Sequence, residues 1–300
     1  MTRRTIIGLI AAVIAAACGV TILIGFGVVG GPTPTEELPR TPTPAVPTTT
    51  VTRIALAGDT GTGPGSAIEA TVTAMNEQGR LRNYDGLVLL GDLIYPEGDA
   101  DQAASRITDV FTPLTSRGTR LVPVLGNHDY MSDEQAAILT EVGRGEQTWY
   151  ADRVGIVRIL VLDTEEVDNP AQTTWLQETL ASPTEAAWTI VAMHKAAYSA
   201  GVHGSDTQIQ QQWVPLFEQY DVPLVFAGHD HDYQRSKPIG GVTYVVSGGA
   251  ATLRPTGHED FTEVSTSTLH YVDLLAEDDR LTLRAIDQSG MHFDSFELTR

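Results

Sequence analysis

The stretch Gly86-Leu87-Val88-Leu89-Leu90-Gly91-Asp92-Leu93-Ile94-Tyr95 predicts both a buried strand and part of a site. Its first half is a continuous apolar run, which has the length and composition of a strand covered on both faces. A strand that ends in Gly-Asp places a carboxylate where its backbone stops pairing. The phenol of Tyr95 follows closely enough for both groups to face one metal ion.

Four other apolar runs end in the same way. They are residues 54–57 before Gly58-Asp59, residues 121–125 before Gly126-Asn127-His128-Asp129, residues 189–193 before His194, and residues 224–227 before Gly228-His229-Asp230-His231. In an open α/β sheet, ligands bind at the carboxyl ends of the strands. The five strand ends therefore predict one shared metal pocket.

The rest of the folded part alternates between helical and strand patterns and then changes to strands alone. Helices are expected at residues 66–78, 100–114, 133–142, 173–180 and 207–220, and further strands at residues 157–162, 242–247, 268–276, 281–286 and 292–298. A β/α first part and an all-β tail predict one α/β domain. In it, two packed mixed β-sheets are flanked by helices as an αββα sandwich.

The side chains at the strand ends form a set of metal-binding groups. Asp59 and Asp92 are hard oxygen donors, Tyr95 is a phenol, Asn127 offers a carbonyl oxygen, and His194, His229 and His231 are imidazoles. Seven ligands are too many for one ion with an open position, but they suit two ions that share a carboxylate. A phenolate favours a highly charged hard cation such as Fe(III).

The five blocks resemble the calcineurin-like metallophosphoesterase superfamily and, within it, the purple acid phosphatases. That family has the motifs GDxG, GDxxY, GNH(D/E), VxxH and GHxH, which appear here in order at residues 58–61, 91–95, 126–129, 191–194 and 228–231. Generic members carry a metal-binding His where this chain has Gly61. Tyr95 supplies a replacement ligand, as it does in the purple acid phosphatases.

The resemblance implies a ligand set for each of two ions. Asp59, Asp92, Tyr95 and His231 would hold Fe(III), and Asp92, Asn127, His194 and His229 would hold Fe(II), Zn or Mn. His128 would contact the substrate phosphate, and His203 would give a proton to the leaving group. Asp129 and Asp230 are interpreted as carboxylates that orient imidazoles.

The implied function is that of an acid phosphatase-like enzyme acting on small phosphomonoesters, with a metal-bridging hydroxide that attacks phosphorus. One alternative is a metallophosphodiesterase that uses the same site with Mn or Zn. Another is a metal-stiffened surface binding module without catalysis. The formal charge of −19 argues against a nucleic-acid partner. Attraction of an anionic substrate would then have to come locally from bound cations.

Residues 1–31 carry the basic pair Arg3-Arg4 before an apolar run that continues to Gly31. The run exceeds the roughly 7–15 apolar residues of a secretory signal and reaches the length of a membrane span, about 20 residues. A helix that acts as an uncleaved signal anchor is therefore favoured. A cleaved signal peptide is the second interpretation, and a lipid-attachment site at Cys18 is the third.

The basic pair predicts a cytoplasmic N-terminus and an extracytoplasmic remainder. We expect a protein tethered to the cell membrane through its N-terminal helix, or a secreted one if residues 1–31 are cleaved. Residues 32–50 are rich in Pro and Thr, which favours an extended linker. Residues 51–300 would form the metallophosphoesterase catalytic domain.

Overall fold

A computed structural model describes residues 50–300, which belong to one compact unit, Pro47–Arg300. The predicted N-terminal apolar helix, and almost all of the Pro/Thr-rich linker, lie outside the described residues. Within residues 50–300, no helix is both long and apolar enough to cross a membrane.

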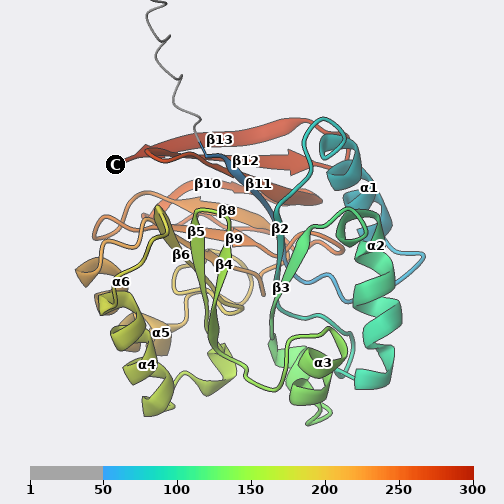
Figure 1. Ribbon diagram of the computed structural model, residues 1–300, viewed down its shortest axis with the longest axis horizontal. Helices are drawn as coiled ribbons and strands as arrows, with labels where there is room; N and C mark the ends of the chain where they lie inside the picture. Colours follow the sequence, from blue (N-terminus) through green and yellow to red (C-terminus); the bar gives the residue numbers. More distant parts are fainter. Residues whose placement is uncertain (1–49) are drawn as a thin grey trace, which may run out of the picture. The chain divides into compact units, whose positions relative to one another are not determined.

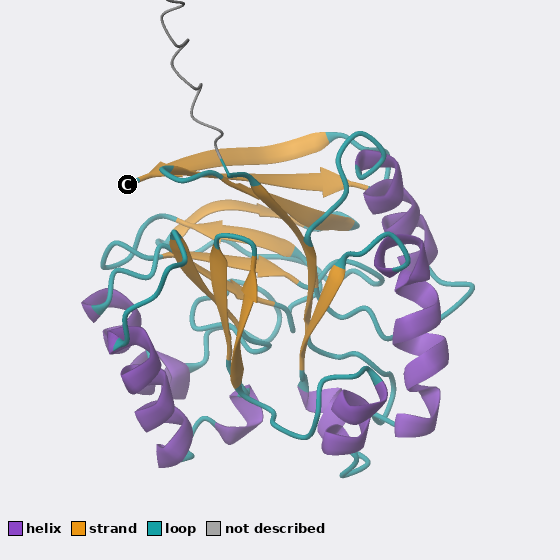
Figure 2. Ribbon diagram, viewed as in Figure 1, coloured by secondary structure: helices purple, strands orange, loops and turns teal. Residues whose placement is uncertain are grey.

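Two β-sheets form the centre of this unit (Figures 1 and 2). The six-stranded sheet has the order β13 (His292–Thr299), β12 (Arg280–Asp287), β11 (His270–Ala276), β1 (Thr52–Ala57), β2 (Gly86–Leu90) and β3 (Arg120–Val124). The seven-stranded sheet has the order β10 (Thr262–Thr266), β8 (Tyr233–Ser236), β9 (Thr243–Ser247), β7 (Leu224–Ala227), β6 (Trp188–Ala192), β5 (Val157–Val161) and β4 (Tyr150–Val154). Both sheets contain parallel and antiparallel pairs, as predicted.

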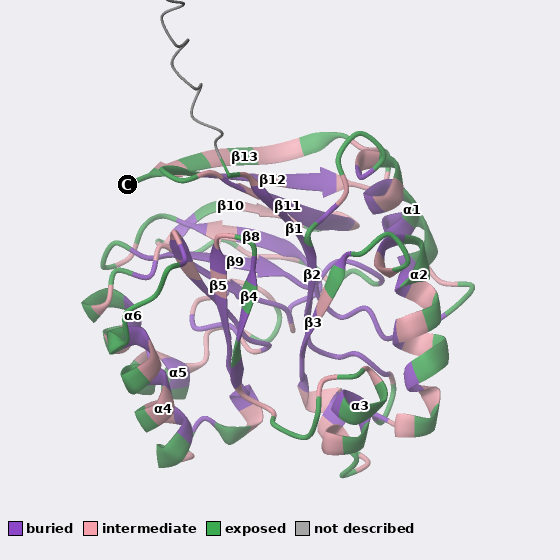
Figure 3. Cartoon of the chain, in the orientation of Figure 1, coloured by how far each residue is buried: buried purple, intermediate pink, exposed green. Residues whose placement is uncertain are grey.

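Helices cover the outer faces of both sheets. On one side lie α1 (Ile68–Gln78), α2 (Asp109–Thr115) and α3 (Gln135–Glu141), and on the other lie α4 (Pro170–Ala181), α5 (Thr207–Gln212) and α6 (Val214–Gln219), as Figure 1 shows. The helices are exposed on their outer faces, whereas the central strands are buried (Figure 3). The predicted αββα sandwich is confirmed.

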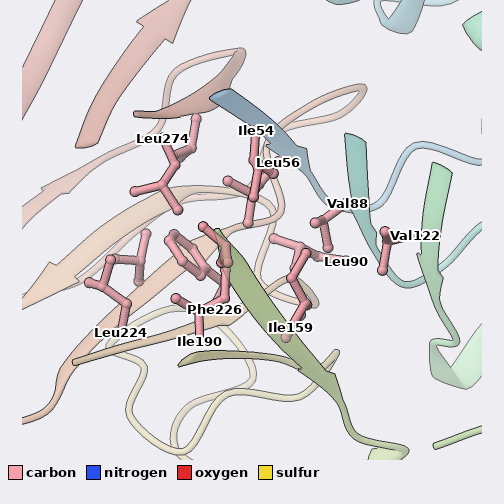
Figure 4. Close-up of a cluster of buried hydrophobic side chains, with 14 of the residues drawn as sticks. Ile54, Leu56, Val88, Leu90, Val122, Ile159, Ile190, Leu224, Phe226 and Leu274 are labelled. Carbon is pink, nitrogen blue, oxygen red and sulfur yellow. The ribbon is translucent and has the colours of Figure 1, made fainter. Parts of the chain in front are cut away.

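The alternation of side chains along β1 shows how the layers are held together. Ile54 and Leu56 point into the core between the two sheets, where they join residues such as Leu90 and Phe226 (Figure 4). Ala55 and Ala57 point to the opposite face and pack under the helices. This period of two is the pleat of a β-strand, and it means that β1 is buried on both faces.

The direction of the strands brings the predicted site residues to one edge. β1, β2 and β3 are mutually parallel in the first sheet, and β5, β6, β7 and β9 are parallel in the second. The loops after β1, β2, β3, β6 and β7 carry the five motifs. The site is therefore built from both sheets.

Two stretches predicted as single helices are each divided into shorter elements in the structure, and each contains a proline. The stretch 100–114 divides into a 3₁₀ turn (Ala100–Gln102), a π turn (Ala104–Thr108) and α2, which contains Pro113. The stretch 207–220 breaks at Trp213, because the ring of Pro215 fits only the first turn of a helix. The strands β4, β8 and β10 were not predicted.

We expect the core between the sheets to dominate stability. Leu274 on β11 is completely buried in it. Leu274→Ala should lower the free energy of unfolding by about 2–5 kcal/mol through lost burial and a cavity. Denaturant titration measures this loss. The matched change Leu81→Ala, at a fully exposed leucine, should leave the free energy of unfolding nearly unchanged. Equal effects of the two changes would contradict the assignment of this core.

Candidate metal centre

Three of the predicted ligands have a left-handed backbone. Asp59 has φ 59°, Asp92 has φ 51° and His229 has φ 68°, and each directly follows a glycine at a strand end. Non-glycine residues rarely adopt this region, and where they do the strain is often associated with a functional site. The chain thus reverses direction sharply at each strand end and turns the side chain toward the shared edge of the sheets.

A first cluster of ligand atoms surrounds the phenol of Tyr95. Its Oη lies 2.8 Å from Asp92 Oδ2, 3.1 Å from Asp59 Oδ1 and 3.1 Å from His231 Nε2. His231 Nε2 is also 3.2 Å from Asp59 Oδ1. The four residues predicted for the first ion therefore point their donor atoms at one place.

A second cluster surrounds the imidazole of His194. Its Nε2 lies 3.2 Å from Asn127 Oδ1, 3.2 Å from His229 Nδ1 and 3.3 Å from Asp92 Oδ1. These are the residues predicted for the second ion. His229 and His231 belong to different clusters although they are two residues apart, as expected if the chain turns between them.

Asp92 belongs to both clusters through different oxygens. Oδ2 faces Tyr95 and Oδ1 faces His194. This is the geometry of a carboxylate that bridges two cations.

The charges of the site suit bound cations. Asp59 is 0% exposed and Asp92 is 2% exposed, and within residues 50–300 neither forms an ion pair with Lys or Arg. Burial, with the charge of Asp92, raises the pKa of Asp59 well above its usual range. Burial and both carboxylates also raise the pKa of the Tyr95 phenol. Buried negative charge of this kind needs a counter-cation, so the residues fit a metal pair.

Burial favours the neutral form of two of the imidazoles, His229 and His231, and this is the form that binds metals. Burial lowers the pKa of His229 to about 2 and, together with Arg254, lowers the pKa of His231. His194 Nδ1 donates a hydrogen bond of 2.8 Å to the carbonyl oxygen of Leu90. His231 Nδ1 lies 2.5 Å from the hydroxyl of Thr252. Both contacts leave Nε2 as the ligand atom and fix the ring.

Gly61 shows how Tyr95 can reach the first cluster. A Cβ atom at this position would lie 2.5 Å from the backbone nitrogen of Ile94 and from the carbonyl carbon of Leu93. Backbone hydrogen bonds from Gly61 N to Asp92 O (3.0 Å) and from Tyr95 N to Gly61 O (3.1 Å) hold the two loops this close. A histidine at position 61 would force the loops apart, whereas the close approach places Tyr95 in the cluster.

His128 lies beside the metal cluster without joining it. Its backbone N–H donates to Asp92 Oδ1 at 3.0 Å, and its Nδ1 donates to the Pro96 carbonyl at 2.6 Å. The Pro96 contact occupies only Nδ1, so the second ring nitrogen remains available to another group. With Tyr95 and His231, His128 lines a cavity of about 390 Å³.

His203 lies on the side of the second cluster. Its ring stacks on His229 with 4.0 Å between the ring centroids, and its Nε2 lies 2.7 Å from Arg254 Nη1. Burial lowers the pKa of His203, and the nearby Arg254 charge acts in the same direction. With Lys195, it lines a smaller cavity of about 110 Å³.

Asp129 and Asp230 were misinterpreted from the sequence, because neither side chain bonds an imidazole. Asp129 accepts hydrogen bonds from the backbone N–H groups of Leu93, Ile94 and Gly126, at 2.8–3.0 Å. Asp230 accepts from the hydroxyl of Ser199 and, at 2.8 Å, from the backbone N–H of His203. Both carboxylates hold site loops through their backbones.

Sequence reasoning also missed Thr252 and Arg254. Both residues lie in the loop after β9, a sixth strand that ends at the same edge of the sheets. The end of this strand has the sequence Ser247-Gly248-Gly249. Small residues at that strand end were the available signal.

The calcineurin-like phosphoesterase family model matches residues 52–233. The chain therefore belongs to that family. It is 30% identical over 220 residues to an uncharacterised protein of Mycobacterium tuberculosis, an alignment that covers 61% of this chain and 40% of that protein. It thus spans less than half the length of that relative.

A further relative and one solved structure of the same fold are phosphatases by name. The chain is 27% identical over 261 residues to human tartrate-resistant acid phosphatase type 5, covering 72% of this chain and 79% of the human one. A purple acid phosphatase from yellow lupin seeds shares its fold, with a TM-score of 0.71 at 20% identity over 84% of this chain and 54% of that one. The resemblance to purple acid phosphatases is confirmed.

We expect Asp129 to position the metal-binding loops. Burial and the charge of Asp92 raise the pKa of Asp129 to about 8, while the three backbone donors oppose this shift. Asp129→Asn keeps the shape of the side chain but replaces one of its two acceptor oxygens with an NH₂ group. That group cannot accept the hydrogen bonds from the backbone N–H donors. Metal affinity should fall about 10- to 100-fold, as for other groups that support ligands. Calorimetric titration of the metal-free protein with Zn²⁺ measures this affinity.

The control is Asp294→Asn, which removes the carboxylate partner of Arg235 on β8. Unchanged affinity in Asp129→Asn would refute the positioning role.

Proposed function

We propose that the chain is a binuclear metal phosphatase that hydrolyses small phosphomonoesters. The observation that carries the proposal is the shared carboxylate of Asp92, with 2.8 Å from Oδ2 to Tyr95 Oη and 3.3 Å from Oδ1 to His194 Nε2. Membership of the calcineurin-like phosphoesterase family and the likeness to named acid phosphatases support it.

The donor atoms support different metals in the two clusters. The first cluster offers a phenol and two carboxylates, a hard and anionic set that favours Fe(III). The second offers the Asn127 amide and two imidazoles beside the shared carboxylate, which suits Fe(II), Zn or Mn. Bound cations of this kind lower the pKa of water and neutralise charge on a phosphoryl group.

The chain's own residues supply orientation and proton transfer. His128 is held by its Nδ1 bond to Pro96 O, so its second ring nitrogen, Nε2, can donate to a phosphoryl oxygen when the ring is protonated. His203, on the other side, can give a proton to the leaving alkoxide once it is protonated. The backbone N–H of His229 donates to Asp59 Oδ2 at 2.9 Å and so keeps Oδ1 directed at the first cluster.

Export is part of the same proposal and is supported by the sequence of residues 1–31 alone. The catalytic domain would face the outside of the cell, tethered by an uncleaved signal anchor. Fractionation of cells that produce the full chain tests this: activity in the membrane fraction supports tethering, and activity in the medium supports cleavage.

Metal analysis with visible spectroscopy tests the centre. The purified full chain should contain two metal ions and show a phenolate-to-Fe(III) absorption band, and Tyr95→Phe should abolish that band because it removes the phenol oxygen. In a panel of mono- and diesters, monoesters should be hydrolysed faster. A colourless, active Mn enzyme that prefers diesters would replace the proposal with the phosphodiesterase alternative.

His128→Ala separates catalysis from metal-stiffened binding. The rate of monoester hydrolysis should fall about 10²- to 10³-fold, the usual cost of removing one hydrogen-bond donor that stabilises charge in the transition state. The metal content should stay the same. His292→Ala changes an exposed histidine on β13 and should leave the rate unchanged. A rate unaffected by His128→Ala would count against the assigned substrate contact.

A further inference from the structure

Arg254 occupies a position between the two substrate-side histidines. Its backbone N–H donates to the carbonyl of His231 at 2.9 Å, which fixes the loop beside the first cluster. Its Nη1 reaches across to His203 Nε2 at 2.7 Å. Arg254 also lines the 390 Å³ cavity together with His128 and Tyr95. A single guanidinium thus borders the space in front of both metal clusters.

The positive charge of Arg254 has no acidic partner among residues 50–300, since no Asp or Glu there forms an ion pair with it. Lys195, the other basic residue near the site, pairs with Glu165 at 2.8 Å. A guanidinium has five N–H donors, and one of them is directed at His203. The remaining donors and the full charge are available to a ligand in the cavity.

The chemistry of the guanidinium indicates what that ligand is. Its planar fork matches phosphate and binds two oxygens at once. A phosphomonoester presents a dianion with three unsubstituted oxygens. In a diester, a second organic group covers one of these oxygens and only one negative charge remains. A cation with several donors at the wall of the site therefore favours the monoester.

The cavity has room for the organic part of such a substrate. Its volume of about 390 Å³ lies within the range of roughly 300–1,000 Å³ typical of small-molecule sites. Leu253, next to Arg254 in the chain, contributes an apolar side chain to the same wall. The loop after β9 thus offers a cation for the phosphate and an apolar contact for the leaving group.

We propose that Arg254 is a specificity-determining residue, which binds phosphate oxygens that face away from the metal centre and so selects monoester dianions over diesters. This inference rests on the proposed phosphatase function. It adds to that function the residue that sets the substrate class, on a loop outside the five motifs.

Arg254→Gln in the full-length protein tests the proposal with two readouts. The first is kcat/KM for an aryl phosphate and for the corresponding methyl aryl diester. The monoester value should fall about 10- to 100-fold, as expected for the loss of hydrogen bonds to a charged group, and the diester value less than about 3-fold. The second is the Kd of inorganic phosphate by calorimetry, which should rise by a similar factor of about 10 to 100.

Two control variants accompany this change. Arg254→Lys keeps the charge without the planar fork and should give intermediate losses. Arg80→Gln makes the same change of charge at an exposed arginine between α1 and β2, before the amino end of that strand. It should alter neither readout, which excludes a general effect of net charge.

The outcomes separate this inference from the proposed function. Equal losses for monoester and diester with unchanged phosphate affinity would overturn the inference, because Arg254 would then act only by positioning His203. Unchanged kinetics in Arg254→Gln would overturn it as well. If the wild type hydrolyses neither ester, the proposed function fails. Weaker phosphate binding in Arg254→Gln would even then support the assigned anion contact.

Discussion

The site depends on one buried carboxylate, that of Asp92, whose two oxygens contact different clusters of side chains. Asp92 directs its two oxygens into different clusters of ligand atoms, and Asp59 adds a second buried negative charge. Within residues 50–300, neither carboxylate is paired with Lys or Arg. Burying charge without a counter-charge is strongly unfavourable, and backbone N–H donors from His128 and His229 offset only part of that cost. A bound cation pair would remove the rest, so we infer that metal binding and stability of the site would be coupled.

The two-sheet architecture is what makes the shared carboxylate possible. Asp59, Asp92, Tyr95 and Asn127 follow strands of the first sheet, whereas His194, His229 and His231 follow strands of the second. Each cluster takes ligands from both sheets. The apolar core between the sheets therefore sets the distances between the side chains of each cluster, and close packing in protein interiors allows little slippage. The core of Figure 4 and the metal centre are consequently parts of one arrangement.

The sequence predicted the features that depend on local pattern, and it failed where distant segments meet. Apolar runs that end in Asp, Asn or His, most of them after a glycine, identify strand ends, so the clustering of the seven side chains and the sandwich could be predicted. Asp129 follows His128 in the chain, and adjacency suggested an imidazole partner. In the 3₁₀ turn Asn127–Tyr130, however, its carboxylate points back to the loop after β2. Arg254 reaches the site through the path of the loop after β9. The small residues at the end of that strand mark the loop, but no local pattern identifies this side chain.

The acidic composition and the proposed cationic centre would together restrict which phosphates can bind. A chain of formal charge −19 repels polyanions as a whole, and a nucleic acid would have to lie against its surface with many phosphates at once. A small ester needs to place only one phosphate, and it meets positive charge where Arg254 borders the proposed metal pair. Physiological salt screens the repulsion between the acidic surface and a phosphate beyond about 8 Å. The binding energy of a single phosphate that reaches the cavity therefore depends mainly on the charges that line the cavity. The surface and the site thus favour the same class of substrate for different physical reasons.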